Sequence, residues 1–486
     1  MDMILKKVSS SPQWLFLIGG MVFSGALYFF STGLEGFRPL LWIAPVPVLI
    51  LSLKSSWRLT AALAFVAYLI GGLNLFGYLS RLAPIGVAVG SIIIPSIAFS
   101  LTVLAYRFAM LHINHPLSFI VFPVVWTSYE YLLSIGSPHG TAGSIAYTQS
   151  DFLSLIQITS LTGIWGITFI LTLVPASIAA AWYYRDKNKK ALVILLSSLA
   201  VGFAIVCYGW IRLSEPASGQ PIRAGLAAID STAEYFETTQ RDEALRVIEA
   251  HTRMIGILAE QGAKIVVLPE KLIGVTDEYE DDILRLLGEA AQQGNVFLVV
   301  GLNRLNPERN RNLAAIISPD GRLLAEYDKA FLVPGFESKF DRGTRLVNFK
   351  VSGLSAGVTI CKDMDFPRWI SRYGSAGVGI LFVPAWDFTE DAWLHSRMAI
   401  LRAVENGFAL VRSAKEGFLT VCDYRGRIIG DVASSASPEV HLVDEVTYGP
   451  GRTFYSKAGD WFAWLNLFFL LVFLLKIPKG LAKQVK

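Results

Sequence analysis

Seven apolar runs before residue 214, each close to the length that crosses a bilayer, limit what this chain can fold into. The hydrocarbon core of a membrane is roughly 30 Å thick, and about 20 helical residues cross it. In lipid the backbone must satisfy its own hydrogen bonds, so such runs form helices. We expect spans at residues 14–31, 37–53, 59–79, 84–106, 117–134, 161–183 and 191–212, and an eighth from Trp461 to Leu475.

The composition agrees with a membrane protein and excludes some other classes. Of the residues, 53% are hydrophobic and only 17% are charged, and the mean hydropathy is +0.47, which is too apolar for an ordinary soluble protein. The net charge of +4 comes from short basic clusters between apolar runs, so we expect no nucleic-acid binding. The three cysteines are too few for a disulfide framework.

The first apolar run follows Lys6 and Lys7, as the apolar part of a signal peptide would. Its apolar region is long, however, and no small-residue cleavage site follows it. We therefore interpret it as a retained helix.

The distribution of Lys and Arg predicts the orientation in the membrane, because cytoplasmic loops are enriched in these residues. Loops of one set carry little beyond Arg38 and Arg81. The N-terminus, the other loops and the C-terminus carry Lys6, Lys7, Lys54, Arg58, Arg107, the run from Arg185 to Lys190, Lys476, Lys479, Lys483 and Lys486. Both termini are therefore expected in the cytoplasm, and the segment between the seventh and eighth helices outside, which in a bacterium is the periplasm.

The segment 215–450 differs from its surroundings because charged residues become frequent and short β-branched runs alternate with amphipathic stretches. Apolar strands such as KIVVLPE and VGILFVPAW predict a sheet covered on both faces. Pro319-Asp320-Gly321 and Tyr424-Arg425-Gly426 are typical of hairpin turns. We predict an α-β-β-α sandwich here, and three parts in all: a seven-helix transmembrane domain at 1–214, a periplasmic α/β domain at 215–450, and a final helix with a cytoplasmic tail at 451–486.

Three chemically reactive residues each follow a predicted strand, namely Glu270, Lys329 and Cys361. Layered α/β proteins place their sites at strand ends. The residues from Asp363 to Pro367 are typical of a helix start, and a helix N-terminus at Cys361 would favour its thiolate. A nearby ammonium would favour the thiolate further and stabilise an oxyanion, while a carboxylate moves protons. The set predicts acyl-transfer chemistry.

Each of these residues taken alone has a simpler interpretation. A cysteine at the end of a buried strand is more often part of a core, and Glu270, Lys329 or Glu337 in GFESKF could each be a solvated polar residue. Only the ordered combination of the three favours a catalytic site.

The order of VVLPE, DKAFLVPGFE and ICKDMDFP resembles the nitrilase or carbon-nitrogen hydrolase superfamily, and within it the bacterial apolipoprotein N-acyltransferase family. Seven helices, a periplasmic nitrilase-like domain and one last helix are that family's plan, so the resemblance covers essentially the full chain. The stretches GSIAYTQSDFLSLIQITSLTGIWGITFI and HSRMAILRAVENGFALVRSAKEGFLTVCDYRGRI are also similar to the family.

The resemblance implies a ping-pong reaction in the bacterial inner membrane. Cys361 would take an acyl chain from a phospholipid as a thioester, and the N-terminal amine of a lipoprotein would then accept that chain. Glu270 would act as the base, while Lys329 and the backbone N–H after the cysteine would hold the oxyanion. Glu337 matches a second family glutamate that positions the site. We expect a monomer that works without a metal or cofactor.

The chain departs from the family pattern at three places. Lys362 and Asp363 follow the cysteine, where the family has Tyr and Glu. Lys362 is expected either to depress the pKa of Cys361 or to recognise a phosphate, or else to cap an exposed turn. The loop reads Gly335-Phe336-Glu337 where the family has Phe-Gly-Glu, and the interval 330–360 is short, so the apolar arm that clasps lipid there is expected to be short or missing.

Other candidates are weaker. Trp386 and Asp387 resemble the family's substrate loop, while core or interfacial packing is the alternative for Trp386 and for Trp393. His395 lies near the start of a predicted helix, and His139, between the fifth and sixth apolar runs, could face the site or only solvent. No paired His/Cys metal spacing or nucleotide fingerprint is seen in the sequence.

Two other functions stay open from the sequence. A membrane-tethered amidase, or an acyltransferase with another amine acceptor, would agree with the altered Lys362-Asp363 pair and the short interval. A non-enzymatic membrane scaffold would keep the fold without the chemistry, although the intact set of Glu270, Lys329 and Cys361 disfavours it.

Overall fold

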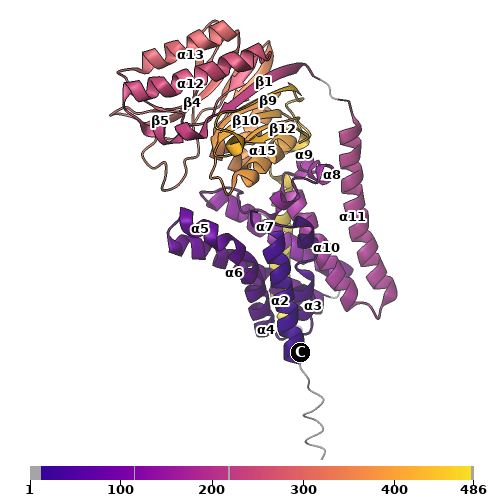
Figure 1. Cartoon of the computed structure of the whole chain (residues 1–486). Helices are drawn as coiled ribbons and strands as arrows, with labels where there is room; N and C mark the ends of the chain where they lie inside the picture. Colours follow the sequence, from indigo (N-terminus) through magenta and orange to yellow (C-terminus); the bar gives the residue numbers. More distant parts are fainter. Residues whose placement is uncertain (1–12, 35, 114, 217–218, 483–486) are drawn as a thin grey trace, which may run out of the picture.

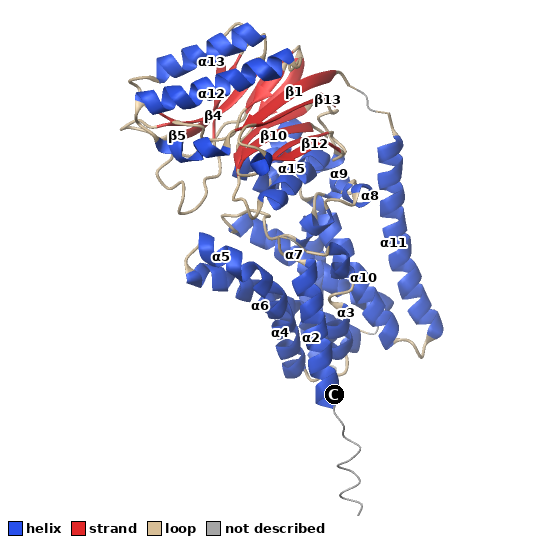
Figure 2. Cartoon of the chain, viewed as in Figure 1, coloured by secondary structure: helices blue, strands red, loops and turns tan. Residues whose placement is uncertain are grey.

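The computed structural model describes residues 13–34, 36–113, 115–216 and 219–482, and shows a helical bundle with an α/β domain at one end (Figure 1). Helices make up the bundle, and the strands gather in the α/β domain (Figure 2). The C-terminus lies at the end of the bundle that is far from the α/β domain. The chain enters the α/β domain from the long helix α11 (Asn188–Ser214) and returns to the bundle in α17 (Trp461–Ala482).

Six helical stretches of the described chain are long and apolar enough to cross a membrane. In the bundle the helices are α2 (Gln13–Ser31), α3 (Val46–Ser52), α4 (Trp57–Gly72), α5 (Phe76–Leu82), α6 (Ile85–His112), α7 (Val121–Gly136), α8 (Leu153–Ile156), α9 (Thr159–Thr162), α10 (Trp165–Tyr183) and α11, with α16 (Phe454–Ala458) and α17 after the α/β domain. Short 3-10 helices lie at Arg38–Trp42, Leu73–Leu75, Pro116–Ile120 and Ile145–Gln149.

The predicted second span, 37–53, is not one continuous helix. It consists of the 3-10 helix Arg38–Trp42 and the short α3, with Pro39 and Pro45 at or near their starts. Proline lacks the N–H that continues a helix and clashes with the preceding turn. The apolar stretch of α17, Trp461–Lys476, is shorter than these six helices. The expected count of eight spans therefore stays a prediction.

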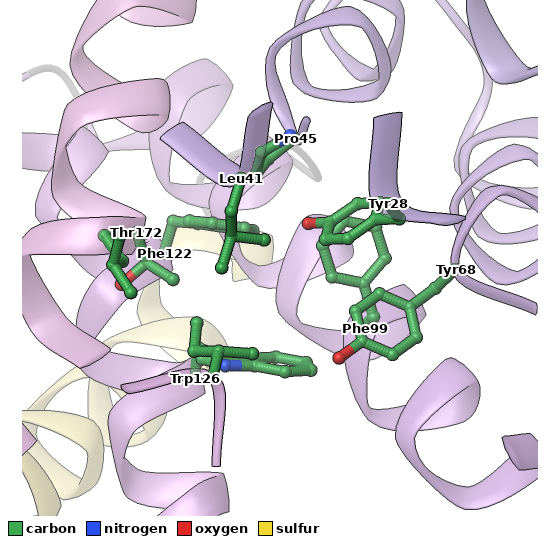
Figure 3. A pocket seen from close by; sticks show the side chains of 10 residues that line it. Tyr28, Leu41, Pro45, Tyr68, Phe99, Phe122, Trp126 and Thr172 are labelled. Carbon is green, nitrogen blue, oxygen red and sulfur yellow. The ribbon is translucent and has the colours of Figure 1, made fainter. Parts of the chain in front are cut away.

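Aromatic side chains fill the middle of the bundle. Tyr28 on α2, Tyr68 on α4, Phe99 on α6 and Trp126 on α7 pack with ring centroids 4.9–5.8 Å apart, within the range of favourable aromatic pairs. They surround a cavity of about 10 Å³, seen from close by in Figure 3. A cavity of this size holds at most about one water, so it is too small to take an acyl chain. The helix α2, which contains the first apolar run, is thus part of the packed bundle.

The α/β domain consists of two stacked sheets. One has the order β13-β1-β2-β4-β5-β6, with β3 paired to β4, and the other has the order β12-β11-β10-β9-β8-β7. The strands of the first sheet are β1 (Pro221–Ala228), β2 (Ile265–Val267), β3 (Gly274–Val275), β4 (Phe297–Arg304), β5 (Arg311–Ile317), β6 (Leu323–Asp328) and β13 (Val440–Thr447). Those of the second are β7 (Val347–Val351), β8 (Leu354–Val358), β9 (Ile380–Trp386), β10 (Ala409–Lys415), β11 (Phe418–Cys422) and β12 (Ile428–Ala433).

Alternation along the strands explains why this domain has three apolar layers. In β2, Ile265 and Val267 face the core between the sheets, while Val266 faces the helices, because successive side chains point to opposite faces of a sheet. Helices α12 (Arg241–Glu260) and α13 (Glu280–Gly294) cover the first sheet, and α14 (Pro367–Ser375) and α15 (Ala392–Asn406) cover the second. The predicted α-β-β-α sandwich is confirmed.

The two predicted hairpins are confirmed as well. The turn at 319–321 joins β5 to β6, and the turn at 424–426 joins β11 to β12, each as an antiparallel pair. Of the basic residues that predicted the orientation, Lys6, Lys7, Lys483 and Lys486 lie outside the described residues.

A loop of the bundle contacts the turn that carries Cys361. The backbone N–H and the hydroxyl of Thr141 both donate to the Asp365 carbonyl oxygen, at 3.0 and 2.8 Å. Gly140 adopts φ +52°, and a Cβ there would collide with the same carbonyl. A second contact is the buried ion pair of Arg402 and Glu405 on α15, at 2.7 Å, in which Glu405 also accepts the N–H of Ile164 at 2.9 Å. The α/β domain is therefore fixed to the bundle through polar bonds.

We expect Gly140→Ala to loosen this junction, because a side chain would meet both the left-handed backbone and the Asp365 carbonyl. The stability should fall by about 1–3 kcal/mol, in the range of strained-backbone substitutions, and appear as a lower melting temperature of the purified protein. Gly143→Ala is the matched control, since a Cβ at Gly143 meets nothing within 4 Å. Equal melting temperatures for the two variants would contradict the proposed close contact.

Candidate active site

A buried ammonium lies at the centre of the candidate site. Lys329 follows β6, and its Nζ is 2.8 Å from Glu270 Oε1 and 3.0 Å from Glu337 Oε2. Asn312 on β5 donates to both carboxylates from Nδ2, at 2.6 and 2.8 Å. All four side chains are at most 1% exposed. Because charges this deeply buried are stable only when paired and hydrogen-bonded, the four residues form one interdependent unit.

Glu270 and Cys361 are both hydrogen-bonded to the last residues of β9. The N–H of Glu270 donates to the carbonyl of Ala385 at 3.2 Å, and the thiol of Cys361 donates to the carbonyl of the next residue, Trp386, at 3.4 Å. Cys361 itself has φ +40°, an uncommon backbone conformation for a residue other than glycine. The structure thus brings Glu270, Lys329 and Cys361 together at the strand ends, as the sequence predicted for their positions.

The electrostatic surroundings of Cys361 differ from the expectation. Burial raises the pKa of the thiol well above its ordinary value, the Glu270 carboxylate raises it further, and the Lys329 ammonium opposes them. The helix start predicted between Asp363 and Pro367 is confirmed, since α14 begins at Pro367. Cys361 is not at the N-terminus of that helix, because Cys361–Asp365 forms a separate 3-10 helix. An α-helix dipole therefore does not act directly on the sulfur. These effects favour the neutral thiol.

Asp363 connects the cysteine turn to the chain after Lys329. One carboxylate oxygen accepts the N–H of Ala330 and of Phe331, at 3.1 and 2.8 Å. The other accepts the hydroxyl of Tyr327 at 2.7 Å and the N–H of Ile360 at 3.1 Å. Burial raises the pKa of Asp363 to about 6. This carboxylate therefore holds the loop carrying Lys329 against the turn carrying the thiol.

Lys362 points away from the thiol, toward the bundle. It is 6% exposed, and its Nζ lies 3.3 Å from Asp365 Oδ2 and 3.3 Å from Nδ1 of His139. The alternative of a lysine capping an exposed turn is therefore wrong. His139 faces this lysine, and burial together with the Lys362 charge lowers the pKa of the imidazole.

Asp387 and His395 form a second polar cluster next to Cys361. Asp387 is paired with Arg412, whose Nη1 donates to it at 2.9 Å. His395 bonds Asp391 at 3.1 Å. Burial disfavours the charged imidazole, but the neighbouring carboxylates outweigh it and raise the pKa of His395 to about 9. Tyr78 of α5 donates to Asp391, so the cluster reaches a bundle helix.

The interval 330–360 before Cys361 consists of a loop and the strands β7 and β8, and the loop exposes an apolar side chain. Phe336 is 54% exposed, and its ring centroid lies 5.5 Å from that of Phe388. Trp386, a candidate substrate-binding residue from the sequence, accepts the Cys361 thiol at its backbone carbonyl. Its indole N–H donates to Glu416 at 2.9 Å.

Three residues near the site were missed from the sequence. Asn312 is a polar residue inside an apolar strand, a pattern that can signal a buried bond. Lys271 follows Glu270 and pairs with Glu337. Lys415 ends β10, and its Nζ donates to the Lys271 carbonyl at 2.8 Å. Within the described ranges, no group of three or more His, Cys, Asp or Glu side chains is arranged to hold a metal ion.

The arrangement suits nucleophilic acyl chemistry. A thiol, a carboxylate able to take its proton, and an ammonium able to stabilise an oxyanion meet at one strand end. Two family models match the chain side by side: "Apolipoprotein N-acyltransferase N-terminal domain" at residues 24–177 and "Carbon-nitrogen hydrolase" at residues 231–448. The chain belongs to the apolipoprotein N-acyltransferase family.

The curated relatives agree with this family along most of their length. The chain is 28% identical to the apolipoprotein N-acyltransferase of Geobacter metallireducens, over 91% of this chain and 92% of that protein. It is 26% identical to apolipoprotein N-acyltransferase 2 of Treponema denticola, over 75% and 78%. Among solved structures, an amidase from Nesterenkonia sp. is 20% identical with a TM-score of 0.41, covering 48% of this chain and 94% of that chain. At these identities the chain is a divergent member of the family.

Replacing Glu337 by Gln should destabilise the α/β domain at neutral pH. Burial works against this carboxylate, but the Lys329 and Lys271 ammonium groups outweigh it and lower the pKa of Glu337 to about 2. We expect a loss of about 3 kcal/mol in the free energy of unfolding at pH 7, typical of breaking a buried pair. Its pKa when unfolded is about 4.3, so the stabilisation is complete above that pH and disappears as the pH falls toward 2.

Denaturant unfolding of Glu337→Gln and wild type between pH 3 and pH 7 measures this difference. Glu289→Gln is the matched control, because Glu289 pairs with Arg285 at 3.0 Å on the surface of α13 with 49% of its side chain exposed, and such pairs contribute about 0–1 kcal/mol. A Glu337 variant whose deficit is independent of pH would contradict the ion-pair account.

Proposed function

We propose that this chain is a membrane N-acyltransferase that moves a fatty acyl chain from a phospholipid, through a thioester on Cys361, to the N-terminal amine of a lipoprotein. The observation that carries the proposal is that Glu270 and Cys361 are bound to consecutive residues at the end of β9, with the Lys329 ammonium 2.8 Å from the Glu270 carboxylate. The family of the chain supplies the acyl donor and the amine acceptor.

In the first half-reaction Glu270 takes the proton of the Cys361 thiol, and the thiolate attacks the ester carbonyl carbon of the phospholipid. The carbonyl oxygen becomes an oxyanion, which the Lys329 ammonium and the backbone N–H of Lys362 stabilise. The ester C–O bond then breaks, and Glu270 returns its proton to the leaving oxygen. The products are a lysophospholipid and an acyl thioester.

In the second half-reaction the amine attacks the thioester carbonyl, and Glu270 takes a proton from the amine nitrogen. The C–S bond breaks as the amide forms, and the proton returns to the Cys361 sulfur. A thioester keeps the acyl group activated while the site exchanges one lipid for another. Glu337 and Asp363 hold Lys329 and its loop through their bonds, and Trp386 and Asp387 at the end of β9 shape the entrance for substrate.

The position of the site beside the bundle suits lipid substrates. Arg81 of α5 pairs with Glu390 at 3.1 Å, and the Arg38 guanidinium lies 3.6 Å from the centroid of the Trp393 ring. The start of α15 therefore sits on the bundle, so both lipids reach the site by lateral diffusion.

The same contacts support a periplasmic catalytic domain. The loops that carry few Lys and Arg residues contact the α/β domain through Arg38 and Arg81. In the loops rich in Lys and Arg, the Lys54 ammonium and the Arg185 guanidinium instead each lie 4.3 Å from the centroid of the Trp182 ring. The basic-rich end is thus away from the catalytic domain, as the positive-inside rule expects for an external domain. We assign residues 1–214, 215–450 and 451–486 to the transmembrane, catalytic and final-helix parts.

A membrane-tethered amidase would use the same thiol but release its product to water. The match of residues 24–177 to an acyltransferase-specific domain and the names of the curated relatives favour transfer to an amine instead.

Intact-protein mass spectrometry tests the thioester. Wild-type protein incubated with phospholipid and no amine should gain the mass of one fatty acyl chain, and Cys361→Ala should gain none while keeping its melting temperature. Cys207→Ala is the matched control, because Cys207 lies in α11 and should acylate at the wild-type rate. An increment that persists in Cys361→Ala would refute the nucleophile, and its absence from the folded wild type would favour the amidase.

Reporter fusions test the orientation. Alkaline phosphatase fused after residue 450 should be active, because that position is expected in the periplasm, and green fluorescent protein fused after Lys486 should fluoresce in the cytoplasm. The reverse pattern of activity would place the catalytic domain in the cytoplasm and contradict the proposal.

A further inference from the structure

Lys415 is a buried lysine at the rim of the site that the proposed reaction does not use. It ends β10, where it pairs in register with Trp386 of β9, and it is 1% exposed. In the described structure its ammonium makes one hydrogen bond, to the Lys271 carbonyl at 2.8 Å, although an ammonium has three donors. Its Nζ also lies 3.8 Å from the centroid of the Trp386 ring. Burying an ammonium with one hydrogen bond and no direct ion pair destabilises the folded state.

The two partners of this ammonium lie next to the two reacting side chains. Lys271 directly follows Glu270 and has φ +52°, so its backbone is in a conformation that needs support from its surroundings. Trp386 supplies the carbonyl that accepts the Cys361 thiol. A single cation therefore contacts the residue after the base and the residue that holds the nucleophile.

We propose that Lys415 is a positioning residue for the acyl transfer, which holds the Lys271 carbonyl and the Trp386 ring and thereby fixes Glu270 against Cys361. This inference rests on the proposed function. The Lys415 side chain does not touch the reacting atoms in the proposed steps; it acts through its two neighbours.

Both interactions of the Lys415 side chain depend on its charge. A hydrogen bond from a charged donor is roughly twice as strong as one from a neutral donor, and a cation–π contact needs the cation. Burial lowers the pKa of Lys415 to about 7, although Glu270 opposes this effect. The other charged or titratable groups that face it are Lys271, Glu416 and Asp230 and, on α12, His251. The positioning effect should therefore weaken as the pH rises through about 7.

The test follows the rate of thioester formation on phospholipid from pH 6 to pH 8.5 in folded, purified variants. Lys415→Met should slow it about tenfold at pH 6.5, in the range expected for losing one bond from a charged donor. Lys415→Arg keeps its charge at every pH, so the ratio of its rate to the wild-type rate should rise with pH. Lys264→Met, at an exposed lysine just before β2, should match wild type throughout.

A purely structural role would lower the melting temperature without changing the shape of the pH profile. The proposal is overturned if folded Lys415→Met acylates at the wild-type rate, or if the ratio of the Lys415→Arg rate to the wild-type rate is constant with pH. If Lys415→Arg does not fold, the ratio of the wild-type rate to the Lys415→Met rate is used instead. The proposal requires this ratio to fall above pH 7, and a constant ratio overturns it.

Failure of the proposed function gives a different result. In that case wild type forms no acyl increment from phospholipid at all, as Cys361→Ala does. The same variants are then compared by the rate at which iodoacetamide alkylates Cys361, read at the peptide level. That rate needs only the thiol and its base, so it tests the positioning by Lys415 without any lipid substrate.

Discussion

The active site depends on burying one ammonium between two carboxylates. Lys329 lies between Glu270 and Glu337, with Asn312 donating to both acids. None of these groups is stable in such a dry place alone, because an unpaired buried charge destabilises a fold by several kcal/mol. The loops after β2 and β6 must therefore meet in one arrangement. The chemistry uses groups that the fold already has to hold in place.

The turn after Cys361 is held from two directions by its two aspartates. Asp363 faces inward and accepts backbone N–H groups from the loop after Lys329. Asp365 faces the bundle, where its carbonyl accepts two bonds from Thr141 and its carboxylate pairs with Lys362. The nucleophile thus sits on the segment that joins the catalytic domain to the membrane domain. In the proposed reaction this places the thiol beside the bundle while Glu270 and Lys329 stay buried.

The surroundings of the Cys361 thiol agree with the proposed role of Glu270 as its base. Burial and the Glu270 carboxylate raise the pKa of Cys361, and Lys329 only partly opposes them. A cysteine kept protonated at rest is a weak nucleophile toward water-borne reagents. In the proposed reaction Glu270 removes the thiol proton, and the Lys329 ammonium stabilises the oxyanion that forms when the thiolate attacks. The departure from the family pattern at Lys362 leaves this balance untouched, since that lysine is paired with Asp365 and faces His139.

Much of the architecture and the order of the candidate site could be predicted from local patterns. Runs of apolar residues and their alternation report burial directly, so the strands, both hairpins and the positions of Glu270, Lys329 and Cys361 at strand ends followed from the sequence. The break in the span at 37–53 depends on how the chain turns at Pro39 and Pro45, which hydropathy averages out. The helix α14 begins at Pro367, at the end of the stretch expected to start it, while the Asp363 side chain caps a separate 3-10 turn at Cys361–Asp365 and also bonds to the loop after Lys329.

The sequence by itself determined a membrane-anchored α/β fold and placed the candidate groups Glu270, Lys329 and Cys361 after its strands. The tertiary structure alone decided which partners those groups have. Asn312, Lys271 and Lys415 join the site because strands distant in sequence are stacked in a particular register, and Lys362 leaves it because its turn faces the bundle. Hydropathy and strand pattern report how deeply a residue is buried, but the direction of a charged side chain is set by the opposite charges it meets only after the sheets have stacked.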